Sequence, residues 1–391
     1  MIKNSFMYIA ALVFICAILV NLPKIFKGKT SQKIFSFAPP IVLIYLGLML
    51  LCTANLWDLE ATSQVYGAIK NPILYAMLFV MLLRCDLREI IKLGPKMLIG
   101  FFSATLSIAL GFVVSYAIMH TLLGADAWQA LGALCGSWMG GGGNMLAIQA
   151  ALDVSEASMA YTLVVDSICA TVYIMFLLWA INFHHKFNSW TKADTSVIDA
   201  IGTSLKEKEA QNKNKLSWHS LLLMLGAGLL VSAVSQNLGE VIASALPIFD
   251  KSTWTVLIVT LVGILLAMTP LGKIKGTEEI SNILLYIVIA LIASRADLGG
   301  IGNAPVWLLS GFIILAIHVS IMLIFAKLFK IDIFTCAVAS LANIGGTATA
   351  PVLAGTYSKA LVPVGIIMAL LGYVIGTGGG LIVARIMSFW G

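Results

Sequence analysis

Two stretches of this chain are apolar enough to enter a membrane, yet glycines beside an asparagine interrupt each of them in the middle. The first, at 137–149, holds four consecutive glycines before Asn144, and the second, at 341–353, holds Asn343 shortly before a glycine pair. They occupy corresponding points of the two halves of the chain. Non-helical backbone survives in hydrocarbon only where it is buried in protein or lines a cavity. A pair of such breaks is therefore the best sequence indicator of a binding site in a transporter.

The composition indicates a helical membrane protein that crosses the bilayer many times. Hydrophobic residues make up 60% of the chain and charged residues 11%, with a mean hydropathy of +0.99, whereas soluble domains carry about 25% charged residues. The formal net charge is +6, but most of the 24 Lys and Arg residues gather in short loops between apolar stretches. This is how residues that set membrane topology are distributed. We therefore expect the lipid bilayer, and no nucleic acid, as a partner.

Twelve apolar windows divide into two sets of six. A polar stretch of mixed charge at 184–216 separates the sets, and we interpret it as a solvated linker. The expected domains are a first transmembrane repeat at 1–183, this linker, and a second transmembrane repeat at 217–391. The windows are 6–22, 39–56, 65–83, 97–123, 127–151, 156–183, 217–238, 253–271, 280–294, 305–327, 333–354 and 359–387.

The basic loops favour one topology over another. If all twelve windows crossed the membrane, the linker and the lysines at 273–275 and 327–330 would lie outside the cell, against the positive-inside rule. If the windows 127–151 and 333–354 entered and left on one side, every basic loop would be cytoplasmic. Residues 127–138 would form about 18 Å of helix, too little to span ~30 Å of hydrocarbon. We therefore predict five crossings and one re-entrant hairpin per half, the alternative being an interrupted helix that crosses fully.

This topology makes the halves inverted copies of each other. Both termini lie outside and the linker is cytoplasmic, so that Arg84 lies inside and Arg295 outside. The motif Arg-Cys-Asp-Leu at 84–87 recurs as Arg-Ala-Asp-Leu at 295–298, each time at the end of the third helix of its half. The predicted fold is thus an all-α polytopic membrane protein built from two inverted-topology repeats.

Three glycine-rich segments carry a resemblance to a known family: Gly136–Met145, Ala342–Pro351 and Gly376–Gly380. With the layout of the whole chain, they resemble the YjcL-like family of uncharacterised bacterial membrane proteins. More distantly, the design is similar to the sodium/glutamate symporters and to the superfamily of bile-acid symporters and cation/proton antiporters. The resemblance implies a secondary transporter of the bacterial plasma (inner) membrane. It also implies an elevator mechanism, in which a core carrying both hairpins slides against a scaffold held fixed, as we expect, by a homodimer.

The polar groups near the two breaks are the candidate ligands. A broken helix frees carbonyl groups that suit Na⁺ and amide groups that suit an anion, and an asparagine side chain offers both an acceptor and donors. The alternative is that the glycines permit close helix packing and the asparagines cap half-helices. The expected substrate-binding and ion-binding residues are Ser137, Gly140, Gly141, Gly142, Gly143, Asn144, Asp166, Asn343, Gly345, Gly346, Thr347 and Thr349.

Two polar residues and a series of glycines outside the breaks are also informative. Asp166 lies inside the apolar window 156–183, where a carboxylate is costly and usually functional, and its placement resembles the ion-binding aspartate of sodium/proton antiporters. We predict that Asp166, Asn144 and Asn343 hold Na⁺, with no other cofactor; the alternative for Asp166 is a structural hydrogen bond. We expect His318 to be a hydrogen-bonded packing residue rather than a proton relay. Glycines recur every four residues from Gly372 to Gly380, which should let the last helix lie against the hairpin.

The sequence is compared with three functions: symport, antiport and enzymatic catalysis. The chain has no nucleotide-binding loop, so an ion gradient must supply the energy, at about 2.3 kcal/mol per charge for 100 mV. The leading hypothesis is sodium-coupled symport of a small anionic organic solute at the two hairpins. The alternative is a cation/proton antiporter that uses Asp166 and needs no organic solute. An enzyme is not expected, because the sequence has neither a GxSxG nor an HExxH motif.

Overall fold

The computed structural model describes residues 1–28, 35, 40–91, 93–124, 126–194, 216–246, 251–295, 304–357 and 361–390. Within these ranges the chain is helical, apart from connecting loops and one isolated bridge between Ile2 and Trp57. The predicted all-α class is therefore confirmed. Of the predicted linker, residues 195–215 lie outside the described residues.

Each predicted apolar window falls on one main helix, except that each glycine-broken window falls on two. The first half holds α1 (Ser5–Ile25), α3 (Pro40–Thr53), α4 (Ser63–Leu82), α5 (Leu87–Ile91), α6 (Gly94–Leu123), α7 (Ala127–Gly140), α8 (Gly142–Leu152), α9 (Glu156–Ala180), η1 (Ile181–Phe183) and α10 (His184–Thr191). The second half holds α12 (Trp218–Ala245), α13 (Lys251–Ala267), η2 (Pro270–Lys273), α14 (Thr277–Ala293), α15 (Ala304–Phe329), α16 (Ile333–Ile344), α17 (Gly346–Tyr357) and α18 (Val362–Met387).

Polar side chains cap the beginnings of several of these apolar helices. The side chains of Asn4, Ser155, Ser217 and Asp332 each accept a hydrogen bond from a backbone amide three residues later. The first amides of a helix have no partner within it, so these caps satisfy groups that would otherwise need water. The caps therefore explain where α1, α9, α12 and α16 begin.

Among the described residues, seven helices are long and apolar enough to cross a membrane: α1, α4, α6, α9 continued into α10, α12, α15 and α18. The sequence predicts ten crossings, five in each half. The other three, α3, α13 and α14, have 14, 17 and 17 residues, or about 21–26 Å of helix. Two of them, α3 and α13, begin next to residues outside the described ranges. The predicted linker also needs a correction, because its first residues form α10, whose apolar side chains pack on α15 and α16.

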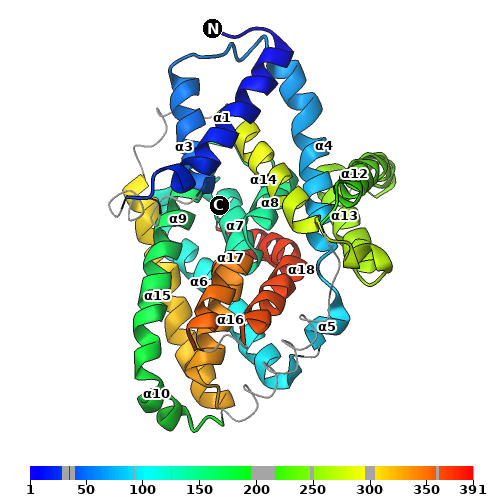
Figure 1. Ribbon diagram of the computed structural model, residues 1–391. Helices are drawn as coiled ribbons and strands as arrows, with labels where there is room; N and C mark the ends of the chain where they lie inside the picture. The colour runs from blue at the N-terminus through cyan, green and yellow to red at the C-terminus, as the bar shows by residue number, and fades with distance from the viewer. Residues whose placement is uncertain are drawn as a thin grey trace.

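The helices pack as two bundles (Figure 1). The first three main helices of each half, α1, α3, α4, α12, α13 and α14, form what we call the flanking bundle. The remaining main helices, α6 to α9 and α15 to α18, form the hairpin bundle. Three helices of the first half pack against their counterparts in the second half: α4 against α14, α6 against α15, and α7 against α16. The bundles meet chiefly where α8 lies against α4 and α13.

Small residues bring the backbones of α7 and α18 into direct contact. A Cβ atom added to Gly380 would lie 3.0 Å from the Cα atom of Gly136, and one added to Gly376 would lie 2.9 Å from the Cα atom of Gly140. One turn further along, a Cβ atom on Gly132 would lie 2.5 Å from that of Ala384. Both helices thus carry a small residue every four positions on the facing side. The packing role predicted for the glycines of the last helix is confirmed.

We predict that Gly380→Ala lowers the stability of the folded protein by about 1–3 kcal/mol, because the added methyl group overpacks the contact. Gly378→Ala is the matched control, since a Cβ atom there meets nothing within 4 Å. Alanine is the better helix former by about 0.5–1 kcal/mol, so the control should be unchanged or slightly more stable. Thermal unfolding in detergent measures both. Equal midpoints for the two variants would contradict the contact between α7 and α18.

Candidate functional site

Both glycine-broken segments fold back on themselves as helical hairpins. In the first, Gly141 takes a left-handed φ of 84°, and the Gln129 side chain at one end donates a hydrogen bond of 3.3 Å to the carbonyl of Leu152 at the other. A helix continuing through the break would separate these residues by about 35 Å. In the second, the rings of Phe334 and Tyr357 lie 4.8 Å apart. Both segments therefore have the predicted hairpin geometry, whereas their re-entry into the membrane, as opposed to a broken helix that crosses fully, stays a prediction.

The tips of the two hairpins meet at Tyr373 of α18. A Cβ atom added to Gly141 would lie 3.3 Å from the Tyr373 Cε1 atom, and one added to Gly346 would lie 4.0 Å from the same atom. The Tyr373 hydroxyl also shares a hydrogen bond of 2.8 Å with Thr347 Oγ1. Because α8 and α17 begin at these tips, the positive ends of two helices lie beside one phenol ring. Sequence reasoning missed Tyr373, although it stands among the glycines already assigned to face the hairpin.

Both asparagines use their amide nitrogen and their side-chain oxygen in hydrogen bonds within the protein. The Asn144 amide donates to the carbonyl of Gly140 (2.6 Å), and its oxygen accepts from the hydroxyl of Thr377 (2.6 Å). The Asn343 amide donates to the carbonyl of Ala339 (2.9 Å), and its oxygen accepts from the hydroxyl of Thr105 (2.8 Å). Both side chains are buried. Asn144 thus caps the end of α7, as the alternative interpretation held, and a direct ligand role for either asparagine stays a prediction.

The glycines of the first tip have separate roles. Gly140 packs on α18, and a Cβ atom at Gly143 would lie 2.6 Å from the sulfur of Met81 in the flanking bundle. Gly141 supplies the left-handed turn, and Gly142 has room for a side chain, with its nearest neighbour 3.9 Å away. Close packing therefore accounts for Gly140 and Gly143, and the left-handed turn accounts for Gly141. All four lie within the hairpin tip that meets Tyr373.

The second tip is more polar than the first. Gly345 ends α16, and a Cβ atom there would lie 1.8 Å from Thr349 Oγ1. Among the described residues, that buried hydroxyl oxygen has no hydrogen-bond partner. Gly346 takes a left-handed φ of 60°. With the Thr347 hydroxyl on Tyr373, this tip offers two hydroxyl groups next to the start of α17.

Asp166 of α9 lies beside the end of α7. It accepts hydrogen bonds from the Trp138 indole nitrogen (2.9 Å) and from Ser137 Oγ (3.2 Å), and its side chain is half-buried. Ser137 and Trp138 belong to the last turn of α7, where the helix dipole is negative. A carboxylate next to the negative end of a helix attracts a cation or a proton. Ser137 and Asp166 were both predicted as site residues, and the structure joins them; Trp138 was not predicted.

His318 is buried and hydrogen-bonded through both ring nitrogens, as expected for a packing residue. Its Nδ1 atom lies 2.7 Å from Ser107 Oγ, and its Nε2 atom lies 2.6 Å from Ser340 Oγ. With the Ser107 hydroxyl donating to the carbonyl of Ala104, a neutral imidazole donates from Nδ1 and accepts at Nε2. Ser340 then accepts from the Tyr173 hydroxyl at 2.7 Å. The resulting chain ties α9, α16, α15 and α6 together.

The two arginines of the repeated motif bridge the same pair of helices from opposite ends. Arg84, after α4, pairs with Glu278 in the first turn of α14 at 2.9 Å. Arg295, after α14, donates to the hydroxyl of Thr62, the residue before α4, at 3.1 Å. The helices α4 and α14 therefore run antiparallel, each arginine holding the start of the other helix. Of the second motif, residues 296–298 lie outside the described residues.

Fold and site together define a polytopic helical membrane protein with two glycine-broken hairpins that meet at their tips. The sequence model of the family described as protein of unknown function (DUF819) matches residues 10–389. The chain therefore belongs to this family, as the glycine-rich segments indicated. It is also 24% identical over 340 residues to the uncharacterized membrane protein YjcL of Bacillus subtilis (strain 168), a match that covers 82% of this chain and 83% of that protein.

The hydrogen bonds of Asn144 predict a measurable contribution to stability. Asn144→Ala should destabilise the protein by about 1–3 kcal/mol, because the Thr377 hydroxyl and the Gly140 carbonyl lose their buried partner. In a double-mutant cycle with Thr377→Val, we expect a coupling energy of about 0.5–3 kcal/mol.

Asn21→Ala is the control, since the exposed Asn21 makes the same side-chain bond to the carbonyl four residues earlier in α1. This control should change stability by at most about 0.5 kcal/mol. Additive effects at 144 and 377 would show that the two side chains are not coupled.

Proposed function

We propose that this protein is a secondary transporter, not an enzyme, and that it binds its solute between the tips of the two hairpins. The observation that carries the proposal is the meeting of two hairpins, one from each half of the chain, at Tyr373. In hydrocarbon such breaks are tolerated where they line a site. The hairpins are re-entrant in this proposal, entering and leaving a bacterial plasma membrane on one side, with the termini outside and the linker 184–216 in the cytoplasm.

The solute is a small organic anion. The first turns of α8 and α17 present backbone amides that have no partner within their helices, together with the positive ends of two helix dipoles. A carboxylate placed there accepts hydrogen bonds from these amides. Further polar contacts come from the hydroxyls of Thr347 and Tyr373, and from the Thr349 hydroxyl, which has no hydrogen-bond partner within the described ranges. No cationic side chain is needed to hold the anion.

Sodium is the coupling ion, and Asp166 is its main ligand. The carboxylate is half-buried beside the negative end of α7. Ser137 lies one turn, about 5 Å, before the tip of the same helix. An ion at Asp166 would therefore restrain the last turn of α7 and with it the tip at Gly141, so that ion and solute bind cooperatively. Asn144 and Asn343 would join the ion only after exchanging their present hydrogen bonds.

The second candidate function is cation/proton antiport at Asp166. The observation that favours it is the half-buried carboxylate, whose hydrogen-bond partners in the described part of the chain, Ser137 and Trp138, are neutral donors. Such a group can exchange a proton for a cation. Antiport needs no organic solute, which distinguishes it from symport by experiment.

The proposal includes inverted repeats. They are supported by the antiparallel pair α4 and α14 and by the reciprocal arginine contacts at its ends.

An elevator movement of the hairpin bundle against the flanking bundle suits the packing between the two bundles. The bundles are joined mainly along α8, where the Thr253 hydroxyl donates to the carbonyl of Ala151 at 3.0 Å. A homodimer through the flanking bundle would hold it fixed, and α13 exposes Leu261 and Leu265 for such a contact.

The first test is thermal stability of the purified protein in Na⁺ and in K⁺, from acidic to alkaline pH. Ligand binding to the native state stabilises it by RT ln(1 + [L]/Kd), or about 2.7 kcal/mol at a hundred times Kd. We expect a Na⁺-specific rise that Asp166→Asn removes and that Asp153→Asn, which changes an exposed acid, retains. A screen of organic anions in Na⁺ should then give a second rise that requires Na⁺.

Each outcome selects a function. A pH response that Asp166→Asn removes, with cation-driven proton release and no effect of any organic anion, assigns antiport. Identical behaviour of Asp166→Asn and wild type in every condition would refute both transport proposals at this residue.

A cross-linking experiment tests the elevator movement. Cysteines at 151 and 253 would join α8 to α13 across the two bundles, and cysteines at 115 and 310 would join α6 to α15 within the hairpin bundle, where the two serine oxygens lie 3.0 Å apart. We expect the first disulfide to stop transport in proteoliposomes until it is reduced, and the second to leave transport intact. Transport that continues with the first disulfide closed would contradict sliding at this contact.

A further inference from the structure

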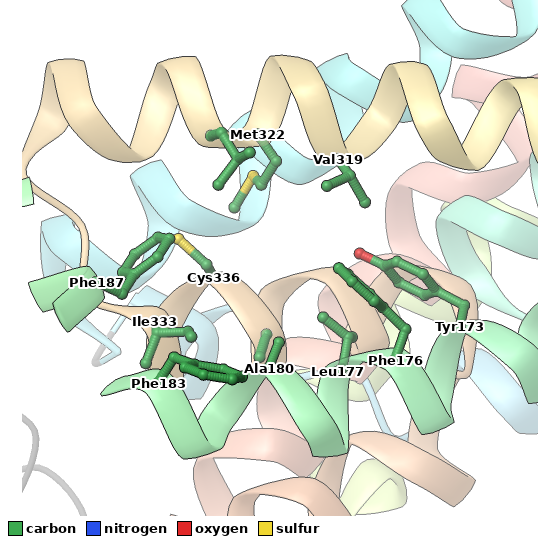
Figure 2. A pocket seen from close by; sticks show the side chains of 12 residues that line it. Tyr173, Phe176, Leu177, Ala180, Phe183, Phe187, Val319, Met322, Ile333 and Cys336 are labelled. Atoms are coloured by element: carbon green, nitrogen blue, oxygen red, sulfur yellow. The ribbon is translucent and has the colours of Figure 1, made fainter. Parts of the chain in front are cut away.

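A cavity of about 190 Å³ lies within the hairpin bundle, away from the hairpin tips. Figure 2 shows it between α15, which contributes Val319 and Met322, and α9, which contributes Leu177 and Ala180, with Ile333 and Cys336 of α16 behind. Its lining is almost wholly apolar, and the hydroxyl of Tyr173 at its edge is used by Ser340. Such a lining does not suit the small polar solute of a transporter. It suits a hydrocarbon chain.

The exposed side chains around the cavity are of the kinds that gather where a membrane meets water. Around it the side chains of Trp179, Phe183 and Trp190 are 59%, 43% and 45% exposed. The lysines at 186, 192, 327 and 330 are exposed beside them. Exposed tryptophans together with lysines mark the interface of a bilayer. In the predicted topology this end adjoins the cytoplasmic linker.

Two exposed lysines are close in the chain to residues that line the cavity. Lys327 follows Leu323, a lining residue, by one turn on the same face of α15, and its Nζ atom donates to the carbonyl of Trp190 and lies 5.2 Å from the centre of that ring. Lys186 directly precedes Phe187, which lines the cavity from α10. The acids on the same elements do not cancel this charge. Asp332 is buried and caps α16. Asp194 contributes one negative charge, whereas the four lysines contribute four positive charges.

We propose that the cavity binds one acyl chain of an anionic phospholipid, with the phosphate held by Lys186 and Lys327. Basic pockets between transmembrane helices on the cytoplasmic side are known sites for anionic head groups. The apolar lining selects a chain from the bilayer, and the charge of the two lysines selects an anionic head group. Because Ile333 and Cys336 belong to α16, the bound lipid would hold the first arm of the second hairpin. This site is independent of the solute site at the tips.

The test is thermal unfolding of delipidated protein in neutral detergent, with phosphatidylglycerol or with phosphatidylcholine of the same acyl chains. Phosphatidylglycerol should raise the midpoint in a saturable way, and phosphatidylcholine and inorganic phosphate should not. Each of Lys186→Gln and Lys327→Gln should weaken the apparent affinity by about fivefold, and both together by about thirtyfold. The pair Lys273→Gln and Lys275→Gln, at a different basic loop, is the control and should bind as wild type does.

A variant that fills the cavity tests the place of the acyl chain. Ala180→Trp should abolish the response to phosphatidylglycerol. The lysine variants change only exposed side chains, so they test the proposal even if Ala180→Trp does not fold. An equal response to the two lipids, a response to inorganic phosphate alone, or equal affinity in the Lys186 and Lys327 variants and the control pair would overturn the proposal.

Discussion

In the contact between α7 and α18, glycine Cα atoms replace side chains as the packing surface over three turns. Two backbones this close exclude side chains and lipid alike, so the contact fixes the position of α7 on α18. It places the first tip on α18, which also packs on α16 and α17, so that one helix supports both hairpins. In a membrane, where lipid tails are as apolar as leucine, close packing of this kind is a main source of helix association.

Most of the buried polar groups of this bundle are satisfied inside the protein. Asn144 and Asn343 use their amides on hairpin carbonyls and threonines, and His318 uses both ring nitrogens on serines. Such pairing is what a low-dielectric interior demands. Asp166 differs, because its partners are neutral donors and its side chain is partly accessible. Because no cationic side chain pairs with this carboxylate among the described residues, Asp166 is the residue to which the proposal assigns the coupling ion.

Much of this arrangement could be predicted from the sequence, for reasons that differ between residues. Apolar windows locate the helices because hydrocarbon thickness dictates their length, and the short arm at 127–138 together with the basic loops predicted the hairpin. Tyr373 and Trp138 escaped prediction because aromatic residues in apolar helices carry no local mark of their partners. The bonds of Asn144 and Asn343 run to Thr377 and Thr105, more than two hundred residues away, and only the fold brings those side chains together.

The last helices of the two halves carry different polar groups at nearly the same depth. Asp166 comes ten residues after the start of α9, and Tyr373 eleven residues after the start of α18. If Asp166 and Tyr373 were exchanged, a carboxylate would lie beside the first turns of α8 and α17, and a phenol would lie beside the end of α7. Each helix is therefore matched to the electrostatic surroundings of its own residue, and neither could take the place of the other.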